Sequence, residues 1–219
     1  PVGSFYLVEH SHVDSETGLP VYIDLEGNET YDYSNDIRKY VGDGLPDFIG
    51  GANNTFRFKN WDLSALATFS IGAKIFDSSA KRQLGVVSGW NMREEKLDRW
   101  RQPGDEATYP RLTLDETTYS LPSGFPWWNT SLFIYDASYI RLRNITLGFN
   151  VPLPAGSSLA SCRVALNATN LLTITNFPGL DPEVVRDFEN AQDRNMSPNV
   201  TYLTPPQERA VTLSISTNF

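Results

Sequence analysis

Cysteine and histidine, on which many enzyme and metal sites depend, are scarce in this sequence. Cys162 is the only cysteine, and His10 and His12 are the only histidines among 219 residues. One cysteine excludes an intrachain disulfide framework and a CxxC motif, so we expect Cys162 to be a small apolar strand residue. GxSxG, P-loop and HExxH motifs are absent, and two histidines near the start leave little for a Ser/His/Asp site. We therefore expect no enzyme activity and no catalytic residues.

Positive charge and long apolar runs are missing too. Lysine and arginine number 18 against 26 aspartates and glutamates, which gives a formal net charge of −8. Nucleic-acid binding requires a concentrated positive surface, so this balance argues against a nucleic-acid partner. No run of about 18 apolar residues occurs, which excludes a spanning helix and leaves membrane-crossing strands open. The first residue is Pro1 and no signal-peptide pattern follows it, so we expect that processing or fragmentation removed the true start.

Alternation of apolar and polar residues is the main pattern that the sequence does contain. Between 209 and 219 the even positions are small or polar, and the odd positions form an apolar row of Val211, Leu213, Ile215, Thr217 and Phe219. The same period of two occurs in 62–74, 143–151 and 162–168. With the tyrosine, phenylalanine, threonine and asparagine content, it predicts an all-β chain. We predict six long strands, near 4–12, 47–58, 62–76, 138–151, 162–174 and 209–219.

The lengths of the connections distinguish a membrane barrel from a soluble sandwich. The connections at 13–46, 77–137 and 175–208 are long, whereas those at 59–61 and 152–161 are short. Transmembrane barrels combine short periplasmic turns with long outer loops, and placing Phe219 at the periplasmic end puts both short connections on that side. Six strands are too few to close a barrel, so we expect an antiparallel transmembrane β-barrel segment that belongs to a larger barrel. The alternative is a secreted soluble β-sandwich that binds carbohydrate.

Five phrases stand out in order along the chain: VDSETGLPVYID (13–24), GDGLPDFIGGANNTFRFKNWDLS (42–64), WRQPGDEATYPRL (100–112), DASYIRLRNITLGFNVP (136–152) and NLLTITNFPGLDPEV (170–184). Together they resemble the C-terminal region of the SusC/RagA family of TonB-linked outer-membrane proteins. Ser15 departs from the family pattern, which has proline there. The last strand resembles the aromatic end signal that barrels present to the assembly machinery, and we assign this signal to Phe219, Ile215 and Leu213.

The resemblance implies the wall of a barrel of about 22 strands that is plugged from inside. It also implies TonB-dependent import of bulky glycans or peptides across a bacterial outer membrane, together with a SusD-like surface lipoprotein. On this basis residues 1–219 are the C-terminal portion of the barrel, and the plug and TonB-contacting segment lie upstream. The expected partners are the rest of the barrel and its plug, the TonB complex, the SusD-like lipoprotein and the lipid bilayer.

Aromatic residues supply the candidate binding and membrane-interface positions. Trp127 and Trp128, late in the longest outer loop, are candidate substrate-binding residues, because exposed aromatic rings stack on sugars or anchor a partner. Alternatively, they lie in the interfacial girdle or pack the loop onto the barrel rim. Trp61 in the short turn and Phe149 at a strand end suit the aromatic girdle on the periplasmic side.

Two polar loops contain possible metal ligands. His10, His12, Asp14 and Glu16 alternate along one strand face, and 24–36 is rich in the oxygen ligands that calcium accepts, without the spacing of an EF-hand loop. Solvated loops produce the same patterns, so we assign no cofactor and keep a loop calcium as an open alternative. Residues 92–101 are predicted to form a helix, with Leu97 and Trp100 on one side.

Overall fold

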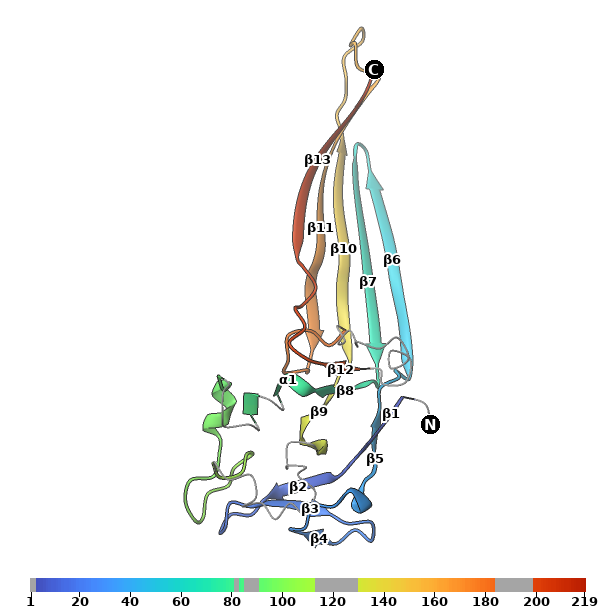
Figure 1. Cartoon of the computed structure of the whole chain (residues 1–219). Coiled ribbons are helices and arrows are strands. Elements are labelled where there is room, and N and C mark those ends of the chain that lie inside the picture. Colours follow the sequence, from blue (N-terminus) through green and yellow to red (C-terminus); the bar gives the residue numbers. More distant parts are fainter. Residues whose placement is uncertain (1–2, 81–82, 85–90, 113–129, 184–198) are drawn as a thin grey trace. The chain divides into compact units, whose positions relative to one another are not determined.

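The computed structural model of the chain describes residues 3–80, 83–84, 91–112, 130–183 and 199–219. The chain divides into two compact units. The wall unit comprises Pro46–Ala73, Ala137–Pro182 and Pro205–Phe219, and the loop unit comprises Pro1–Leu45, Lys74–Asp136 and Glu183–Thr204. In Figure 1 the wall unit contains the long strands, and the loop unit contains the short strands β1 to β5, β8, β9 and β12.

The wall unit is an antiparallel sheet of long strands. These are β6 (Phe48–Phe58), β7 (Trp61–Ile71), β10 (Tyr139–Asn150), β11 (Ser161–Thr175) and β13 (Ala210–Asn218). They lie side by side in the order β13-β11-β10-β7-β6 (Figure 1). Lys59 and Asn60 join β6 to β7, and 151–160 join β10 to β11 at the same end of the sheet. The predicted all-β, antiparallel wall with its two short turns at one end is confirmed.

Two of the predicted strands are divided in the structure. Residues 4–12 form β1 (Ser4–Leu7) and β2 (Glu9–Val13), which pair with β5 and β3 in the loop unit. Within the described residues the wall sheet therefore has five strands and not six. Gly72, with φ +94°, follows the end of β7, and the predicted continuation becomes the separate strand β8 (Lys74–Asp77). Alternation predicts an extended chain, but it does not say which sheet a strand joins.

A bulge in β10 reverses the alternation of its two faces. Leu142 and Asn144 pair with the consecutive residues Ala67 and Leu66 of β7, so Arg143 is the inserted residue. Because one inserted residue shifts a period of two, the apolar face of β10 occupies even positions before the bulge and odd positions after it. The alternation visible after position 143 therefore does not extend back to the start of the strand.

The loop unit forms its own apolar core from short elements. β1 pairs with β5 (Lys39–Asp43), β3 (Pro20–Ile23) lies between β2 and β4 (Glu29–Thr30), and β8 lies between β9 (Ile134–Asp136) and β12 (Val200–Thr201). The short helices are η1 (Asn35–Ile37), α1 (Ser78–Ala80), η3 (Glu94–Leu97) and η5 (Ser131–Phe133). The core consists of Val8, Tyr22, Tyr33, Phe76, Ala80, Leu84, Tyr109 and Phe133. Across the described ranges, no helix combines the length and the apolar character needed to cross a membrane.

The helix predicted over 92–101 is wrong. Helical structure there is limited to the single 3-10 turn Glu94–Leu97, because the Trp100 N–H donates to the Tyr109 carbonyl over 2.9 Å. Lys96 is buried, and its ammonium lies 5.4 Å from the centre of the Tyr109 ring. Burial lowers the pKa of Lys96 to about 8. Pairing between residues distant in sequence has overridden the local helical pattern.

Candidate functional site

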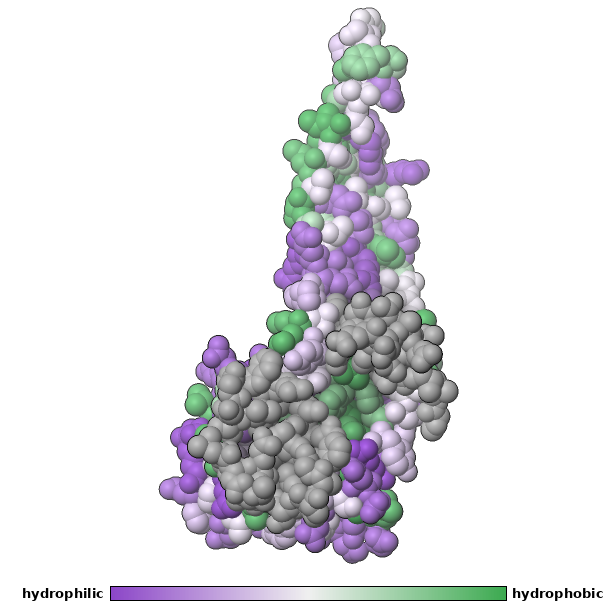
Figure 2. All heavy atoms as spheres, in the orientation of Figure 1, coloured by the Kyte–Doolittle hydropathy of each residue, from purple (hydrophilic) through white to green (hydrophobic). Residues whose placement is uncertain are grey.

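One face of the wall sheet carries a broad field of apolar side chains. Cross-strand pairing aligns them in rows, and the two rows nearest the short turns are Phe58, Trp61, Phe149, Val164 and Ile215, and Phe56, Leu63, Leu147, Leu166 and Leu213. Leu213 and Ile215 are 66% and 67% exposed. Figure 2 shows green, apolar spheres along the region of the long strands, next to purple, hydrophilic ones. Because a water-facing surface rarely has so large an apolar patch, this outer face is suited to lipid.

An aromatic row lies at the turn end of the outer face. The rings of Trp61 and Phe149 are 4.5 Å apart between centroids, and Phe58 pairs with Trp61 on the adjacent strand. The sequence suggested that Trp61 lies in the turn, but in the structure it is the first residue of β7. The structure thus brings Trp61 and Phe149 together at one height, as a girdle requires, and their contact with a membrane interface stays a prediction.

Ile215 and Leu213 point from β13 onto the same outer face, in the rows of Val164 and Leu166. Phe219 follows the last residue of β13 and is 90% exposed. Their proposed role as a recognition signal for barrel assembly stays a prediction. Cys162 lies on β11 opposite Thr217 and is partly buried, so the predicted strand position is correct.

The inner face carries an ion pair that crosses a whole strand near the turns. Arg163 of β11 donates to both carboxylate oxygens of Asp62 on β7, over 2.7 Å from Nη2 to Oδ2. β10 runs between them, and its Gly148 pairs with Asp62 of β7 on one side and with Ala165 of β11 on the other. A Cβ atom at Gly148 would overlap the guanidinium of Arg163 and the carboxylate of Asp62. The glycine is therefore what lets the two charged groups meet.

Hydrogen-bonded amides continue the polar inner face toward the middle of the sheet. Asn144 Nδ2 donates to Asn167 Oδ1 over 3.1 Å, and Thr146 Oγ1 donates to Asn144 Oδ1 over 3.0 Å. Leu66, the exception in the alternation of β7, pairs with Asn144 in this inner region. The inner face thus satisfies its polar groups within the sheet, as a surface lining a water-filled or protein-filled lumen can.

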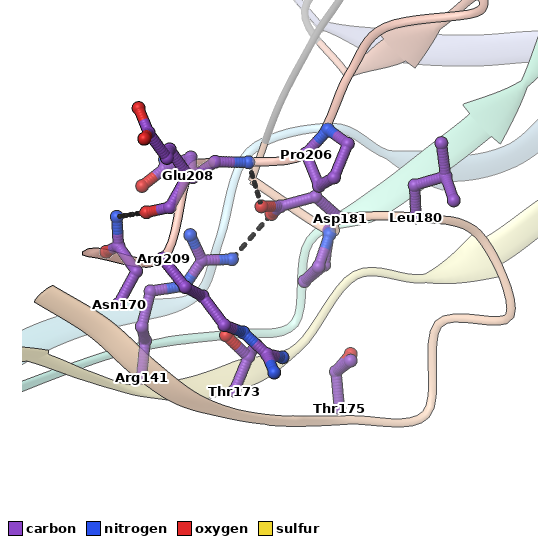
Figure 3. A pocket seen from close by; sticks show the side chains of 11 residues that line it. Arg141, Asn170, Thr173, Thr175, Leu180, Asp181, Pro206, Glu208 and Arg209 are labelled. Atoms are coloured by element: carbon purple, nitrogen blue, oxygen red, sulfur yellow. Dashed lines mark hydrogen bonds and ion pairs between the residues drawn. The ribbon is translucent and has the colours of Figure 1, made fainter. Parts of the chain in front are cut away.

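A second network lies at the end of the sheet from which the long connections leave. Arg141 Nη2 donates to Asp181 Oδ1 over 2.5 Å, and the two residues are 1% and 7% exposed. Figure 3 shows the pair of Arg141 and Asp181. Asp181 Oδ2 accepts from the backbone N–H of Gln207 over 3.1 Å, and Gln207 Oε1 accepts from Arg143 Nη1 over 2.9 Å. Arg143 Nε donates to Thr68 Oγ1 over 3.0 Å. These bonds fasten the segments around Asp181 and Gln207 to β7 and β10.

Reasoning from the sequence missed both networks. The available signal for the first was a charged residue at a polar-face position in each of two strands, Asp62 and Arg163. For the second it was the presence of Arg141 and Asp181 in two separate family-like phrases. Neither signal states which charges pair, because the pairing depends on register and on the Arg143 bulge.

The structure separates the histidines that the sequence offered as metal ligands. A register shift lies between His10 and His12; the His10 ring packs edge-on to Tyr22 at 6.4 Å, and His12 Nδ1 lies 3.5 Å from Glu29. Burial, together with the charge of His12, lowers the pKa of His10 to about 4. Among the residues that the structure describes, no group of three or more histidine, cysteine, aspartate or glutamate side chains converges as metal ligands would.

Two acidic side chains of the loop unit, Asp14 and Asp24, stabilise its turns through hydrogen bonds. Asp14 accepts hydrogen bonds from the Tyr31 hydroxyl over 2.5 Å and from the Thr17 N–H over 2.7 Å, which lower its pKa to about 2. Asp24 accepts from the Asn28 N–H over 2.7 Å. These carboxylates therefore close turns of their own loops. Trp127 and Trp128, the candidate substrate-binding residues, lie outside the described residues.

Comparisons with known proteins agree with this geometry. TonB-dependent receptor P3 of Formosa agariphila is 30% identical over 235 residues, which cover 100% of this chain and 22% of the relative. TonB-dependent receptor SusC of Bacteroides thetaiotaomicron is 25% identical over 188 residues, covering 83% of this chain and 17% of the relative. The solved RagAB peptide transporter superposes with a TM-score of 0.77 at 24% identity over 97% of this chain and 22% of its own. No protein-family model matches.

An antiparallel sheet with an exposed apolar face and a hydrogen-bonded polar face, superposing on barrel-forming receptors, is a segment of a transmembrane β-barrel wall. The chain spans about a fifth of the length of the relatives that it matches. It belongs to the SusC/RagA family of TonB-dependent receptors. The family resemblance of the five sequence phrases and the barrel-segment fold are both confirmed.

Proposed function

We propose that this chain is the C-terminal part of the wall of an outer-membrane importer that takes up bulky oligomers, glycans or peptides, in a TonB-dependent manner. The observation that carries the proposal is the division of the sheet into a lipid-compatible face and a polar face. A barrel wall needs both faces, because hydrocarbon lies outside it and a lumen lies inside it. The names of the relatives, receptors and a peptide transporter, support import and not bond chemistry.

The partners of the proposed importer are a plug, the TonB complex and a SusD-like surface lipoprotein. Support comes from the SusC-like and RagAB-like relatives, the second of which is a two-component assembly by its name. Residues that would contact TonB belong to the parts of the relatives that this chain does not match. The loop unit, with its own buried core, offers a folded surface for a lipoprotein, and Trp127 and Trp128 remain the proposed cargo contacts.

The soluble carbohydrate-binding sandwich is the weaker alternative. In a sandwich, apolar faces of two sheets pack against each other and become buried. Here the apolar side chains of the wall sheet remain largely exposed, with Phe56 at 66%. The exposed face therefore favours a membrane wall over a sandwich.

The proposal is tested on the full-length protein in its own membrane. We expect detergent and not salt to extract it, and we expect a heat-dependent shift in gel mobility, because intact barrels resist unfolding in detergent. Uptake of fluorescent maltoheptaose and of fluorescent peptides is then compared before and after collapse of the proton-motive force that drives TonB. Release by salt alone, or uptake that does not depend on this force for either probe, would contradict the proposal.

A further inference from the structure

A pocket of about 620 Å³ opens on the inner face of the wall, beside the Arg141–Asp181 ion pair (Figure 3). Its lining includes Asn170, Thr173, Thr175, Leu180, Pro206 and Arg209. This volume lies in the range of pockets that hold small ligands or parts of larger ones. All of the lining belongs to the wall unit, so the pocket is formed within one compact unit.

Hydrogen bonds hold both rims of this pocket in place. Asp181, at the foot of one rim, is fixed by Arg141 and by the N–H of Gln207. The other rim is fixed by Asn170, which adopts φ +50° and donates from Nδ2 to the Glu208 carbonyl over 3.0 Å. A left-handed conformation is unusual for a residue other than glycine and is found where surrounding contacts impose it. The rims are therefore pre-formed, which lowers the entropy cost of binding.

Arg209 stands in this pocket because the strand ladder stops one residue short of it. Thr169 and Ala210 are the last pair between β11 and β13. Strict alternation would turn Arg209 outward with Val211, onto the lipid-facing side, where a charge is costly. Instead the chain leaves the ladder, and the Arg209 side chain lies over Thr173, on the opposite side of the chain from the Glu208 side chain (Figure 3).

The charges of the pocket are unevenly satisfied. Arg141 is paired with Asp181. The side chain of Glu208, the other acidic lining residue, points away from the Arg209 guanidinium (Figure 3). The described part of the chain provides no hydrogen bond or ion pair to the side chain of Arg209. A guanidinium presents a planar fork of donors that matches a carboxylate, so the group missing from this pocket is an anionic, planar acceptor.

We propose that this pocket binds a carboxylate group of the imported cargo, with Arg209 as its donor. Thr173 adds a hydroxyl to the lining, and Leu180 and Pro206 supply apolar surface for the part of the cargo next to the carboxylate. No aromatic ring is among the lining residues that the structure describes, so a neutral sugar would find no stacking surface. The carboxylate can come from a peptide or from a uronic acid. The proposal rests on the proposed function, because cargo must reach the inner face.

The test measures binding to the purified full-length protein with matched acidic and neutral probes. One pair is a fluorescent peptide of alternating alanine and serine, with a free C-terminal carboxylate or with an amide. A third peptide carries the amide and one glutamate, and the sugar pair is trigalacturonate and maltotriose. We expect one acidic probe to bind about tenfold more tightly than its neutral partner. A charge-assisted hydrogen bond usually contributes at least this ratio of dissociation constants. Its identity assigns the source of the carboxylate.

The variant Arg209→Gln should abolish that preference while leaving the neutral probes unchanged. Arg57→Gln, which removes an exposed arginine from β6, is the matched control and should keep the preference. Correct assembly of each variant is checked by the heat-dependent gel shift. Equal affinity for acidic and neutral probes in the unaltered protein overturns the proposal without any variant, and so does a preference that survives Arg209→Gln. Force-dependent uptake of a neutral probe by cells that carry the unaltered protein would leave the proposed function intact.

Discussion

The two units of this chain treat apolar side chains in opposite ways. In the loop unit Val8, Tyr22 and Phe133 are completely buried in a common core. In the wall unit Phe56 and Leu213 are both 66% exposed, and the most buried side chain is the charged Arg141. A protein surrounded by water alone would not be stable with the second arrangement, because the hydrophobic effect drives apolar area out of water. The difference shows that the two units face different solvents.

The contribution of an ion pair to stability also depends on how deeply the pair is buried. In the wall unit the Arg141–Asp181 pair is buried and is fixed by a further hydrogen bond from Gln207. In the loop unit the Lys39–Glu9 pair, with 2.6 Å between Nζ and Oε2, has side chains 28% and 44% exposed, although the Asp77 carboxylate that pairs with Arg93 is buried. Removing one partner of a buried pair leaves an uncompensated charge, whereas an exposed charge is solvated by water. Substitutions that look alike should therefore differ between the units.

The largest contrast is expected for a buried phenylalanine and an exposed one. Phe133→Ala should destabilise the loop unit by about 3–5 kcal/mol, because it removes a completely buried ring from the core. Phe56→Ala, on the lipid-facing side, should cost much less, since its ring is 66% exposed. Hydrogen exchange of peptides from 1–45 and 46–73 in the full-length protein measures each unit separately. Similar losses of stability for Phe133→Ala and Phe56→Ala would contradict the expected difference between a buried and an exposed ring.

A similar contrast is expected for the ion pairs. Asp181→Asn should destabilise the wall by about 3–5 kcal/mol, because Arg141 would keep a buried and unbalanced charge. Glu9→Gln should change the stability of the loop unit by less than about 1 kcal/mol. Urea unfolding of the assembled protein in detergent gives the first value, and hydrogen exchange of 1–45 gives the second. A loss from Glu9→Gln as large as that from Asp181→Asn would mean that burial does not govern these pairs.

A charge placed on either face of one strand tests which face meets lipid. Ile145→Arg on the outer face should cost about 2–4 kcal/mol, as expected for arginine near the middle of the bilayer. Thr146→Arg, one residue further along β10, points to the inner face and should be tolerated far better. The fraction of protein that assembles into the heat-shifted form reports both variants. The assignment of the faces would be reversed if Thr146→Arg were the more damaging change.

A smaller effect than that of Ile145→Arg is expected at the glycine beneath the crossing ion pair. Gly148→Ala places a methyl group against the guanidinium of Arg163, and overpacking of this kind costs about 1–3 kcal/mol. The same change made together with Asp62→Ala and Arg163→Ala should cost almost nothing, because the overlapping groups are gone. Unfolding midpoints in urea measure both changes. An unchanged cost without the ion pair would show that Gly148 is required for another reason.

The loop unit should also have a pH dependence that arises at His10. The folded state holds the pKa of His10 at about 4, below the ordinary 6.5, so the unfolded chain binds its proton first as pH falls. Stability is therefore complete above about pH 6.5 and declines toward pH 4, by on the order of 1–2 kcal/mol at pH 5. His10→Asn should flatten this decline in hydrogen exchange of 1–45. A decline that persists unchanged in the variant would assign it to other groups.

The sequence by itself determined the class of fold, most of the wall strands and the short turns that join them. Period-two alternation is a local property of each strand, and it reports two solvents on opposite sides of a sheet wherever the strand is regular. For this reason the positions of Leu213, Ile215 and Phe149 on one face were predictable in advance, whereas Trp61 was expected in the turn. The order of family-like phrases added the SusC/RagA family, which the relatives then supported.

Tertiary structure alone decided the rest. Residues 4–12 have the alternation of a wall strand but pair inside the loop unit, because partners distant in sequence determine which sheet a strand joins. Residues 92–101 do not form the predicted helix, because Trp100 pairs with Tyr109. The Arg143 bulge reverses one face of β10, and the end of the ladder at Ala210 turns Arg209 into the inner pocket. Each of these depends on where a neighbouring strand begins, ends or gains a residue, which no local pattern contains.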